Sequence, residues 1–526
     1  MNIDPNEHQP GKRRAHLDTA WSPVADAMRH DLHQLTTKQG NPIDPADPGT
    51  PTSRALALLS CVVVVAMVLL WTNTSDAFKD KIFNTQPAPA VAQSSDRPAP
   101  GNFGEIDIPA RIALRGLTVF KPHLSMSMLV KDETRLIDED KVRLIMLAGE
   151  LEGTESALER IEALKVDRFE RADPRAAPNG ANDLITSDLN ILEAMYIFGI
   201  NALEDNERDQ IAARYGLVGQ VALTHGLDDA DLRRAPLIDG AWAIILFVSI
   251  AGLVLLIVPL TGLCLLVFGV VWISSGKIRL RNHIPAKGGS IFLETYVVFV
   301  GSFLAMLVAA HIFPQIAPYT LILQWLILAT IFWGIFRGMK RKDWKQAIGW
   351  HKGEGIFKEI GCGILAYIAS VPLFLAGTLI TMVLLILKSI VQTLLNNGVA
   401  PKPEPMTNPI VEIIASGDVF TVILLFLLAV TWAPIVEETI FRGALFRHLR
   451  SSMHWVFAAL LSAALFAFMH SYGPLMVSPL IALGFMFAFM REWRGSLIAA
   501  MTAHFLHNFS IIGATVLFVF LLNGPT

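Results

Sequence analysis

The chain has 526 residues, of which 53% are hydrophobic and only 17% are charged, and its mean hydropathy is +0.47. A soluble protein of this length would carry about a quarter charged residues, so a soluble class is excluded. The formal net charge of -3 is too small to indicate nucleic acid or another charged partner. The 3 cysteines all lie in apolar blocks, so we expect neither a disulfide framework nor a CxxC metal site.

The N-terminal half begins with a polar tail and one apolar block. Residues 1–53 are rich in Pro, Asp and His and predict a disordered tail. Residues 54–72 start too late for a cleaved signal peptide and indicate a transmembrane anchor helix. A Pro/Ala/Ser-rich linker follows over residues 73–101. Residues 102–239 are the only sizeable polar region, and their helical patterns predict a soluble, mostly helical domain.

Apolar blocks of about 17 to 30 residues, long enough to cross about 30 Å of hydrocarbon, dominate the remainder. Residues 240–417 contain membrane helices that precede the motif region. Residues 418–526 form a membrane core that contains the sequence motifs described below. We expect an all-α polytopic membrane protein with about nine transmembrane helices and an inserted, mostly helical soluble domain. The expected helices are residues 55–71, 241–274, 291–313, 320–336, 360–387, 419–436, 455–469, 475–490 and 496–522.

The orientation depends on the long block 241–274. At 1.5 Å per residue it would span about 51 Å, which leaves open one tilted helix kinked at Pro259 or a hairpin of two short helices. The loops 277–287 and 337–358 are basic, which places them in the cytoplasm. If the long block crosses the membrane once, the polar domain is extracytoplasmic and the N-terminus is cytoplasmic. We favour this option.

Ionisable side chains inside apolar helices are costly and therefore mark candidate functional sites. Glu437 and Glu438 follow an apolar run and lie about 100° apart around a helix. The i, i+4 spacing of Glu438 and Arg442 predicts a structural ion pair, which leaves Glu437 as the available carboxylate. The alternative is that both glutamates mark the exit of the helix from the membrane.

Two histidine motifs follow. His470 ends the apolar run that begins at Phe466, and taken alone it would more often be a helix-packing residue than a catalyst. His504 and Asn508 share one helix face at i, i+4, and His507 points elsewhere. Three polar side chains in little more than one helical turn are hard to explain by packing alone.

The expected depths of Glu437 and His470 match, and His504 comes close enough in depth to join them after a tilt or a kink of its helix. Glu437 lies roughly 15 residues before the expected turn at residues 451–452, and His470 lies roughly 18 after it, so both are about 22–27 Å from that turn. His504 is about 15 Å from the turn at residues 493–494. We therefore expect Glu437, His470, His504 and Asn508 to converge in a cavity between helices.

The ordered set of APIVEExxFRG, FxxxH and HxxxN over residues 418–522 resembles the CPBP family. These are the CAAX proteases and bacteriocin-processing enzymes, also called Abi, and they include the Ras-converting CAAX endopeptidase. The resemblance implies an intramembrane (metallo)endopeptidase. By position, it implies that Glu437 is the general base that activates a water and that His470 orients this water. It also implies that His504 and Asn508 donate hydrogen bonds to the oxyanion.

The family's metalloprotease label makes Glu437, His470 and His504 candidate Zn²⁺ ligands. No HExxH is present and the ligands would come from three separate helices, so we favour a metal-free glutamate mechanism. The expected partners are membrane lipid and a peptide or membrane-protein substrate, with C-terminally lipidated CaaX proteins as the family's own substrate class. We expect no nucleic acid, and we expect a multi-pass protein of the bacterial cytoplasmic membrane.

Two other functions stay open at this point. In a transporter or proton-coupled channel, Glu437, His470 and His504 would form a proton relay. The chain shows no internal repeat of the kind that many transporters have, and the order of the three motifs favours the peptidase. A silent immunity or scaffold protein of the same fold would have lost its base or a histidine, and none is lost here.

Overall fold

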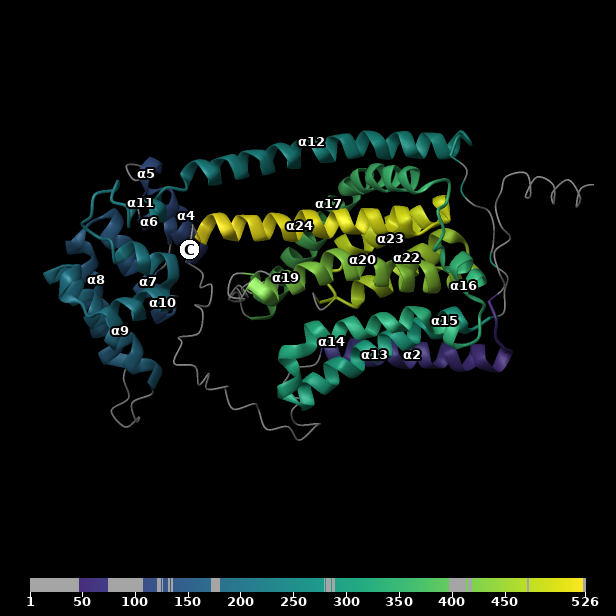
Figure 1. Cartoon of the computed structure of the whole chain (residues 1–526), viewed down its shortest axis with the longest axis horizontal. Helices are drawn as coiled ribbons and strands as arrows, with labels where there is room; N and C mark the ends of the chain where they lie inside the picture. The colour runs from purple at the N-terminus through teal and green to yellow at the C-terminus, as the bar shows by residue number, and fades with distance from the viewer. Residues whose placement is uncertain are drawn as a thin grey trace, which may run out of the picture.

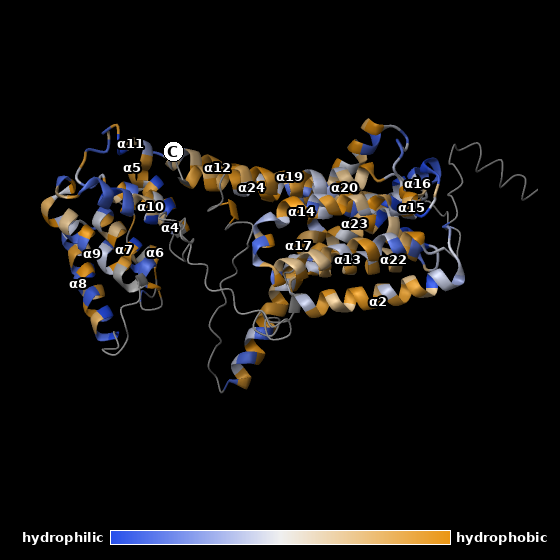
Figure 2. Cartoon of the chain, turned by 60° about the horizontal axis from the view of Figure 1, so that its bottom comes forward, coloured by the Kyte–Doolittle hydropathy of each residue, from blue (hydrophilic) through white to orange (hydrophobic). Residues whose placement is uncertain are grey.

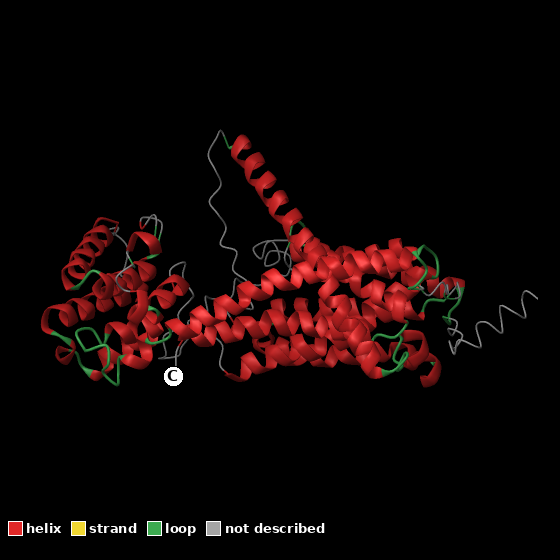
Figure 3. Ribbon diagram, turned by 90° about the horizontal axis from the view of Figure 1, so that it is seen from above, coloured by secondary structure: helices red, strands yellow, loops and turns green. Residues whose placement is uncertain are grey.

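The described part of the chain consists of helices and the loops between them and contains no strand (Figure 3). The computed structural model describes residues 47–73, 107–120, 124, 126–130, 133, 136–171, 180–278, 280, 285, 289–396, 413–414, 419–470 and 473–523. The expected all-α class is confirmed. The predicted disordered tail up to residue 46 and the predicted linker from residue 74 onward lie outside the described residues.

The polar region folds as a helical bundle at one end of the molecule, to the left in Figure 1. Its helices enclose a hydrophobic core of their own, which includes Val142, Ile161, Leu192 and Val218. The elements are α4 (Asp107–Arg115), α5 (Leu117–Phe120), α6 (Met126–Leu129), α7 (Asp138–Leu151), α8 (Thr154–Arg171), α9 (Gly180–Phe198), η3 (Ile200–Ala202), α10 (Asp205–Ala222) and α11 (Ala235–Ile238).

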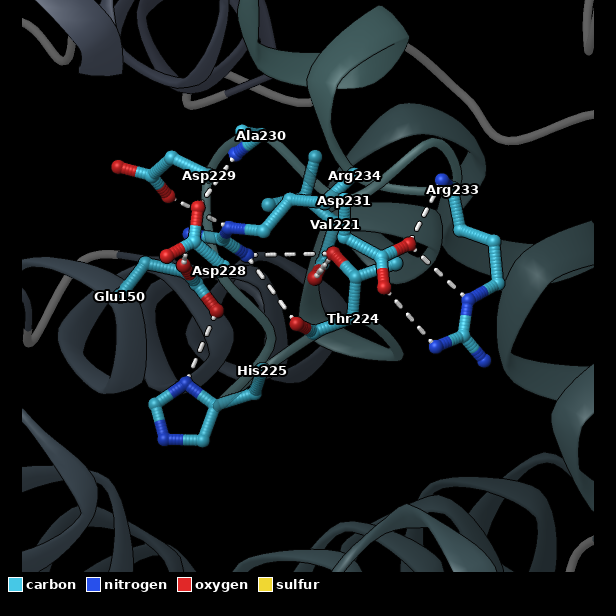
Figure 4. Close-up of polar contacts among 10 residues, drawn as sticks. All are labelled: Glu150, Val221, Thr224, His225, Asp228, Asp229, Ala230, Asp231, Arg233 and Arg234. Carbon is cyan, nitrogen blue, oxygen red and sulfur yellow. Dashed lines mark hydrogen bonds and ion pairs between the residues drawn. The ribbon is translucent and has the colours of Figure 1, made fainter.

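One buried carboxylate ties the bundle helices together (Figure 4). Glu150, near the end of α7, accepts a 2.6 Å hydrogen bond from Arg234 Nη2 and lies 3.0 Å from His225 Nδ1. Arg234 also donates to Thr224 Oγ1 at 3.2 Å and to Asp229 Oδ1 at 2.8 Å. The side chains of Glu150 and Arg234 are only 2% and 4% exposed. The pair therefore fixes α7 against the loop that joins α10 to α11.

The remaining helices form the apolar part of the molecule, which is mostly orange in Figure 2. Before the motif region they are α2 (Pro51–Asn73), α12 (Ala241–Ser274), α13 (Ile291–Ile312), η4 (Pro314–Tyr319), α14 (Thr320–Ile327), η5 (Leu328–Phe332), α15 (Trp333–Phe336), α16 (Arg341–Ile348) and α17 (Ile356–Leu395). The motif region contains α19 (Val419–Leu427), η6 (Leu428–Trp432), α20 (Ala433–Glu437), η7 (Glu438–Leu445), α21 (Phe446–Arg450), α22 (Trp455–Phe468), α23 (Ser478–Arg494) and α24 (Ile498–Asn523).

By length and composition, 7 helices among the described residues can cross a membrane, so the count of about nine is not confirmed. The difference lies in α22 and α23, which have 14 and 17 residues. At 1.5 Å per residue, α22 extends about 21 Å, less than the hydrocarbon thickness of about 30 Å. The helix α22 is a short apolar helix, and α23, which ends in Arg491 and Arg494, packs against both α22 and α17.

The long block 241–274 is one helix, α12, which continues through Pro259. Its apolar side chains are largely exposed, as expected for a helix surrounded by lipid. It contacts the rest of the protein where Gly262 meets α17. A Cβ on Gly262 would lie 2.2 Å from Ile368 O, so the absence of a side chain permits this close approach.

The basic helix ends lie opposite the bundle, where α16 is labelled in Figure 1. There Arg450 on α21 pairs with Glu492 on α23 at 3.2 Å, and Arg494 pairs with Glu359 on α17 at 2.8 Å. At the other end, Arg115 of α4 donates to Leu521 O near the end of α24. The helix α24 thus runs from the bundle to the basic end.

The Glu150–Arg234 pair gives the first prediction. Glu150→Ala removes the buried carboxylate and leaves Arg234 with the half-exposed Asp229 as its acidic partner, so we expect a loss of about 3–5 kcal/mol in the stability of the bundle. The melting temperature and protease resistance of the full-length protein in detergent measure this loss. The control is Asp231→Ala, because the Arg233 side chain that pairs with Asp231 is 71% exposed, and such pairs are worth about 0–1 kcal/mol. Equal effects of both variants would contradict the prediction.

Candidate active site

The motif with the two glutamates lies on a continuous helix that contains wide turns. Val419–Arg450 runs without a break, and its α20 segment is flanked by the π-helical segments η6 and η7. In η6 the N–H of Ala433 is donated to Leu428 O, five residues back. Wide turns of this kind redirect side chains and are frequent at functional sites. Glu437 and Glu438 lie where α20 meets η7.

The Glu438 carboxylate has two partners on one oxygen. Its Oε1 accepts a 2.9 Å hydrogen bond from Arg442 Nη1, the partner expected from the i, i+4 spacing. The same Oε1 lies 2.9 Å from His504 Nδ1 on α24. Arg442 Nη2 also donates to Gly484 O on α23. Glu438 and Arg442 are fully buried, so their opposite charges compensate each other inside the protein.

Aromatic rings surround this charged group. The Arg442 guanidinium lies 4.4 Å from the centroid of the Phe466 ring and 5.2 Å from that of Phe487. Phe487 stacks on the His504 imidazole at 5.2 Å, and Phe466 meets the same imidazole edge-on at 6.1 Å. The rings leave His504 only 4% exposed. The ion pair and the imidazole therefore sit in a medium of low polarity, where electrostatic interactions are stronger than in water.

Glu437 faces the opposite edge of the same imidazole. Its Oε2 lies 3.8 Å from His504 Nε2, which is too long for a direct hydrogen bond. This oxygen has no hydrogen-bond partner among the described residues, although it is buried. The Glu437 side chain as a whole keeps 17% exposure. The two glutamates diverge as expected for neighbours on a helix, and the His504 ring reaches both.

His470 and Asn508 join the group through other contacts. His470, just beyond the end of α22, packs against the Phe466 ring at 4.9 Å, and its Nδ1 lies 3.1 Å from Phe466 O. Because Phe466 also meets His504, one ring contacts both histidines. Asn508 Nδ2 donates to Ala429 O in η6 at 2.7 Å. Asn508 therefore bonds the backbone of the helix that carries the glutamates, about two turns before Glu437.

His507 lies on another side of α24, as the sequence predicts. Its ring packs against Phe374 at 5.4 Å and against Tyr367 at 6.2 Å, both on α17. His507 thus belongs to the contact between α24 and α17. It does not share the aromatic surroundings of His504.

The candidate zinc ligands do not fit a metal centre in this arrangement. Among the described residues, no three His, Cys, Asp or Glu side chains gather closely enough to hold a metal ion. His504 Nδ1 already contacts Glu438. Its Nε2 lies 3.8 Å from Glu437 Oε2, so these two side chains are neighbours, but they form a pair and not the group of three ligands that a zinc site needs. No step proposed below passes through a metal.

Sequence reasoning missed two features of the site. One is the second partner of Glu438, since nothing in the spacing of the motifs indicates that His504 meets this carboxylate. The other is Trp350, whose Nε1 donates to Thr439 Oγ1 at 2.9 Å, while Thr439 donates to Ile435 O at 2.6 Å. Trp350 comes from the basic loop 337–358 and supports the helix at the glutamates. A threonine directly after two glutamates was the available signal for this contact.

The comparisons agree with the motifs. No curated protein and no solved structure matches the chain. Residues 419–510 match the family model described as type II CAAX prenyl endopeptidase Rce1-like. This match covers all three motifs, from the glutamates to Asn508, and it ends within α24. The resemblance to the CAAX protease family is therefore confirmed: residues 419–510 of this membrane protein form an Rce1-like segment, which indicates a protease.

Proposed function

We propose that this protein is an intramembrane endopeptidase in which Glu437 activates the attacking water. The observation that carries the proposal is the contrast between the two glutamates. Glu438 is held through its Oε1 by Arg442 and His504, whereas the 3.8 Å contact of Glu437 with His504 Nε2 is too long for a hydrogen bond. The buried Oε2 atoms of both glutamates have no hydrogen-bond partner among the described residues. A water that bonds both Glu437 Oε2 and His504 Nε2 fits the 3.8 Å between these atoms.

In the proposed reaction, Glu437 removes a proton from the water as the water oxygen attacks the carbonyl carbon of the scissile peptide bond. The carbonyl oxygen becomes the oxyanion of a tetrahedral intermediate. The C–N bond then breaks, and the proton held by Glu437 passes to the leaving nitrogen. A carboxyl and an amine result, with no oxidation or reduction. A positioned base of this kind contributes about 10²- to 10⁴-fold to the rate.

In this proposal His504 Nε2 first holds the water and then, once the water has attacked the carbonyl carbon, donates to the oxyanion. Glu438 holds the Nδ1 edge of its ring at 2.9 Å, so the Nε2 edge faces the side where Glu437 lies. A carboxylate on Nδ1 fixes the orientation of an imidazole, and in this proposal Nε2 donates from the imidazolium form of the ring. His470 packs against Phe466. In this proposal it orients the attacking water, which is the role that the family resemblance implies for it.

We further propose that the substrate is a peptide or membrane-protein segment that reaches the site within the bilayer. The site lies between helices that are apolar enough to span a membrane. The basic ends opposite the bundle would face the cytoplasm, which would place the bundle outside it. Comparative proteomics of a deletion strain would identify the substrate, and the C-terminal sequences of the accumulating proteins would tell whether it carries a lipidated cysteine.

Glu437→Gln tests the base. The amide has the same shape but cannot take the proton, so we expect cleavage of a reporter substrate to fall by at least about 100-fold. Expression and melting temperature should stay almost unchanged, because the Glu437 Oε2 makes no hydrogen bond among the described residues and its contact with His504 Nε2 is long, at 3.8 Å. Glu354→Gln is the matched control, since this half-exposed glutamate pairs with Lys358 in the basic loop. Full activity in Glu437→Gln would rule out the proposed base.

Stability separates the roles of the two glutamates. Glu438→Ala leaves the fully buried Arg442 without its carboxylate, and we expect a loss of about 3–5 kcal/mol. Glu437→Ala removes a carboxylate that makes no hydrogen bond with Oε2, so we expect it to lose less than about 1 kcal/mol. Thermal unfolding of both variants in the same detergent is the measurement. A similar loss in both would contradict the different roles assigned here.

Chelation provides a separate check. Because the candidate ligands do not fit a metal centre, we expect the purified protein to keep its activity after exhaustive treatment with a strong chelator. The assay should include a zinc-dependent peptidase as a positive control for the chelator. Loss of activity that returns when Zn²⁺ is added back would contradict the metal-free mechanism.

A further inference from the structure

One backbone carbonyl in η6 has no helical donor. In a regular α-helix Ala429 O would accept from the N–H of residue 433, and in a π-helix from that of residue 434. The Ala433 N–H is directed to Leu428 O instead. The next residue, Pro434, has no N–H at all. The turn before the glutamates therefore leaves the carbonyl of Ala429 without a donor from its own helix.

Asn508 supplies the missing donor from a different helix. Its Nδ2 lies 2.7 Å from Ala429 O, the length of a short and well-formed hydrogen bond. Inside a membrane an unsatisfied backbone carbonyl is costly, and helices with an internal proline depend on neighbouring side chains to satisfy it. In this structure the side chain comes from α24, one turn after His504.

We propose that Asn508 is a positioning residue that replaces the N–H missing at Pro434 and so locks α24 onto the helix that carries the glutamates. His504 and Asn508 lie four residues apart, and they contact that helix at Glu438 and at Ala429. Two contacts at separate heights fix both the rotation and the sliding of α24. The His504 ring is thereby held between Glu437 and Glu438.

The positioning role of Asn508 concerns the same site as the proposed peptidase function. The expected loss of activity rests on that proposed function, whereas the expected loss of stability does not. The Asn508 amide has a second N–H, which can be donated to the oxyanion while the first bonds Ala429 O. The positioning role makes a prediction that an oxyanion role does not. If an N–H is restored at position 434, the contribution of Asn508 should become smaller.

The test is a double-mutant cycle with Asn508→Ala and Pro434→Ala. Pro434→Ala introduces an N–H in register with the π-helical bonding of η6, where it can be donated to Ala429 O. With Pro434 in place, we expect Asn508→Ala to lower the melting temperature by about 2 °C or more and kcat/KM by about tenfold. In the Pro434→Ala background we expect less than half of that temperature shift and less than about a threefold loss of kcat/KM.

Thr515→Ala in both backgrounds is the matched control, because Thr515 lies on α24 and bonds only Ile511 O of its own helix. Asn508→Ala losses of equal size in both backgrounds, for melting temperature and for activity, would overturn the positioning role. The melting temperature decides the matter even if Pro434→Ala is itself inactive. The melting temperature also tests the positioning role if the natural chain shows no peptidase activity. That outcome would contradict the proposed function but not the positioning role.

Discussion

The site depends on the buried carboxylate of Glu438. One oxygen of this side chain accepts from Arg442 on its own helix and meets His504 on α24, while Arg442 continues to the backbone of α23 at Gly484. Three helices therefore converge on one buried charge pair. Because an uncompensated charge in this apolar interior would be costly, each helix is held at the position where the charges match. Glu437, the preceding residue on the same helix, has a buried Oε2 with no hydrogen-bond partner among the described residues.

The surroundings of this pair make it useful for chemistry. Phe466 and Phe487 cover Arg442 and His504, so the field of the charges is weakly screened. Groups fixed before the reaction need not reorganise as charge develops, which is the main source of electrostatic catalysis in such sites. The same packing explains why the candidate catalytic residues lie on rigid helices: a carboxylate and an imidazole that must share one water tolerate little movement.

The sequence predicts the local part of this arrangement better than the rest. The Glu438–Arg442 contact follows from i, i+4 spacing, because this spacing depends on helix geometry alone. The partner of His504 could not be predicted, because it depends on how α24 rotates against another helix. The count of about nine spans is not confirmed, because α22 and α23 have 14 and 17 residues, and the hydropathy of a sequence does not fix where a helix begins and ends.

Pro434 shows how a local rule carries information about distant contacts. A proline inside an apolar helix must leave a carbonyl without a donor, and the apolar interior requires that another group satisfy it. Asn508 on α24 lies where it can supply this donor. The same α24 is bound near its other end by Arg115 of the bundle, which donates to Leu521 O. The hydrogen bonds at Asn508 and at Leu521 are about 20 Å apart along the helix. The single helix α24 therefore connects the bundle to the candidate active site.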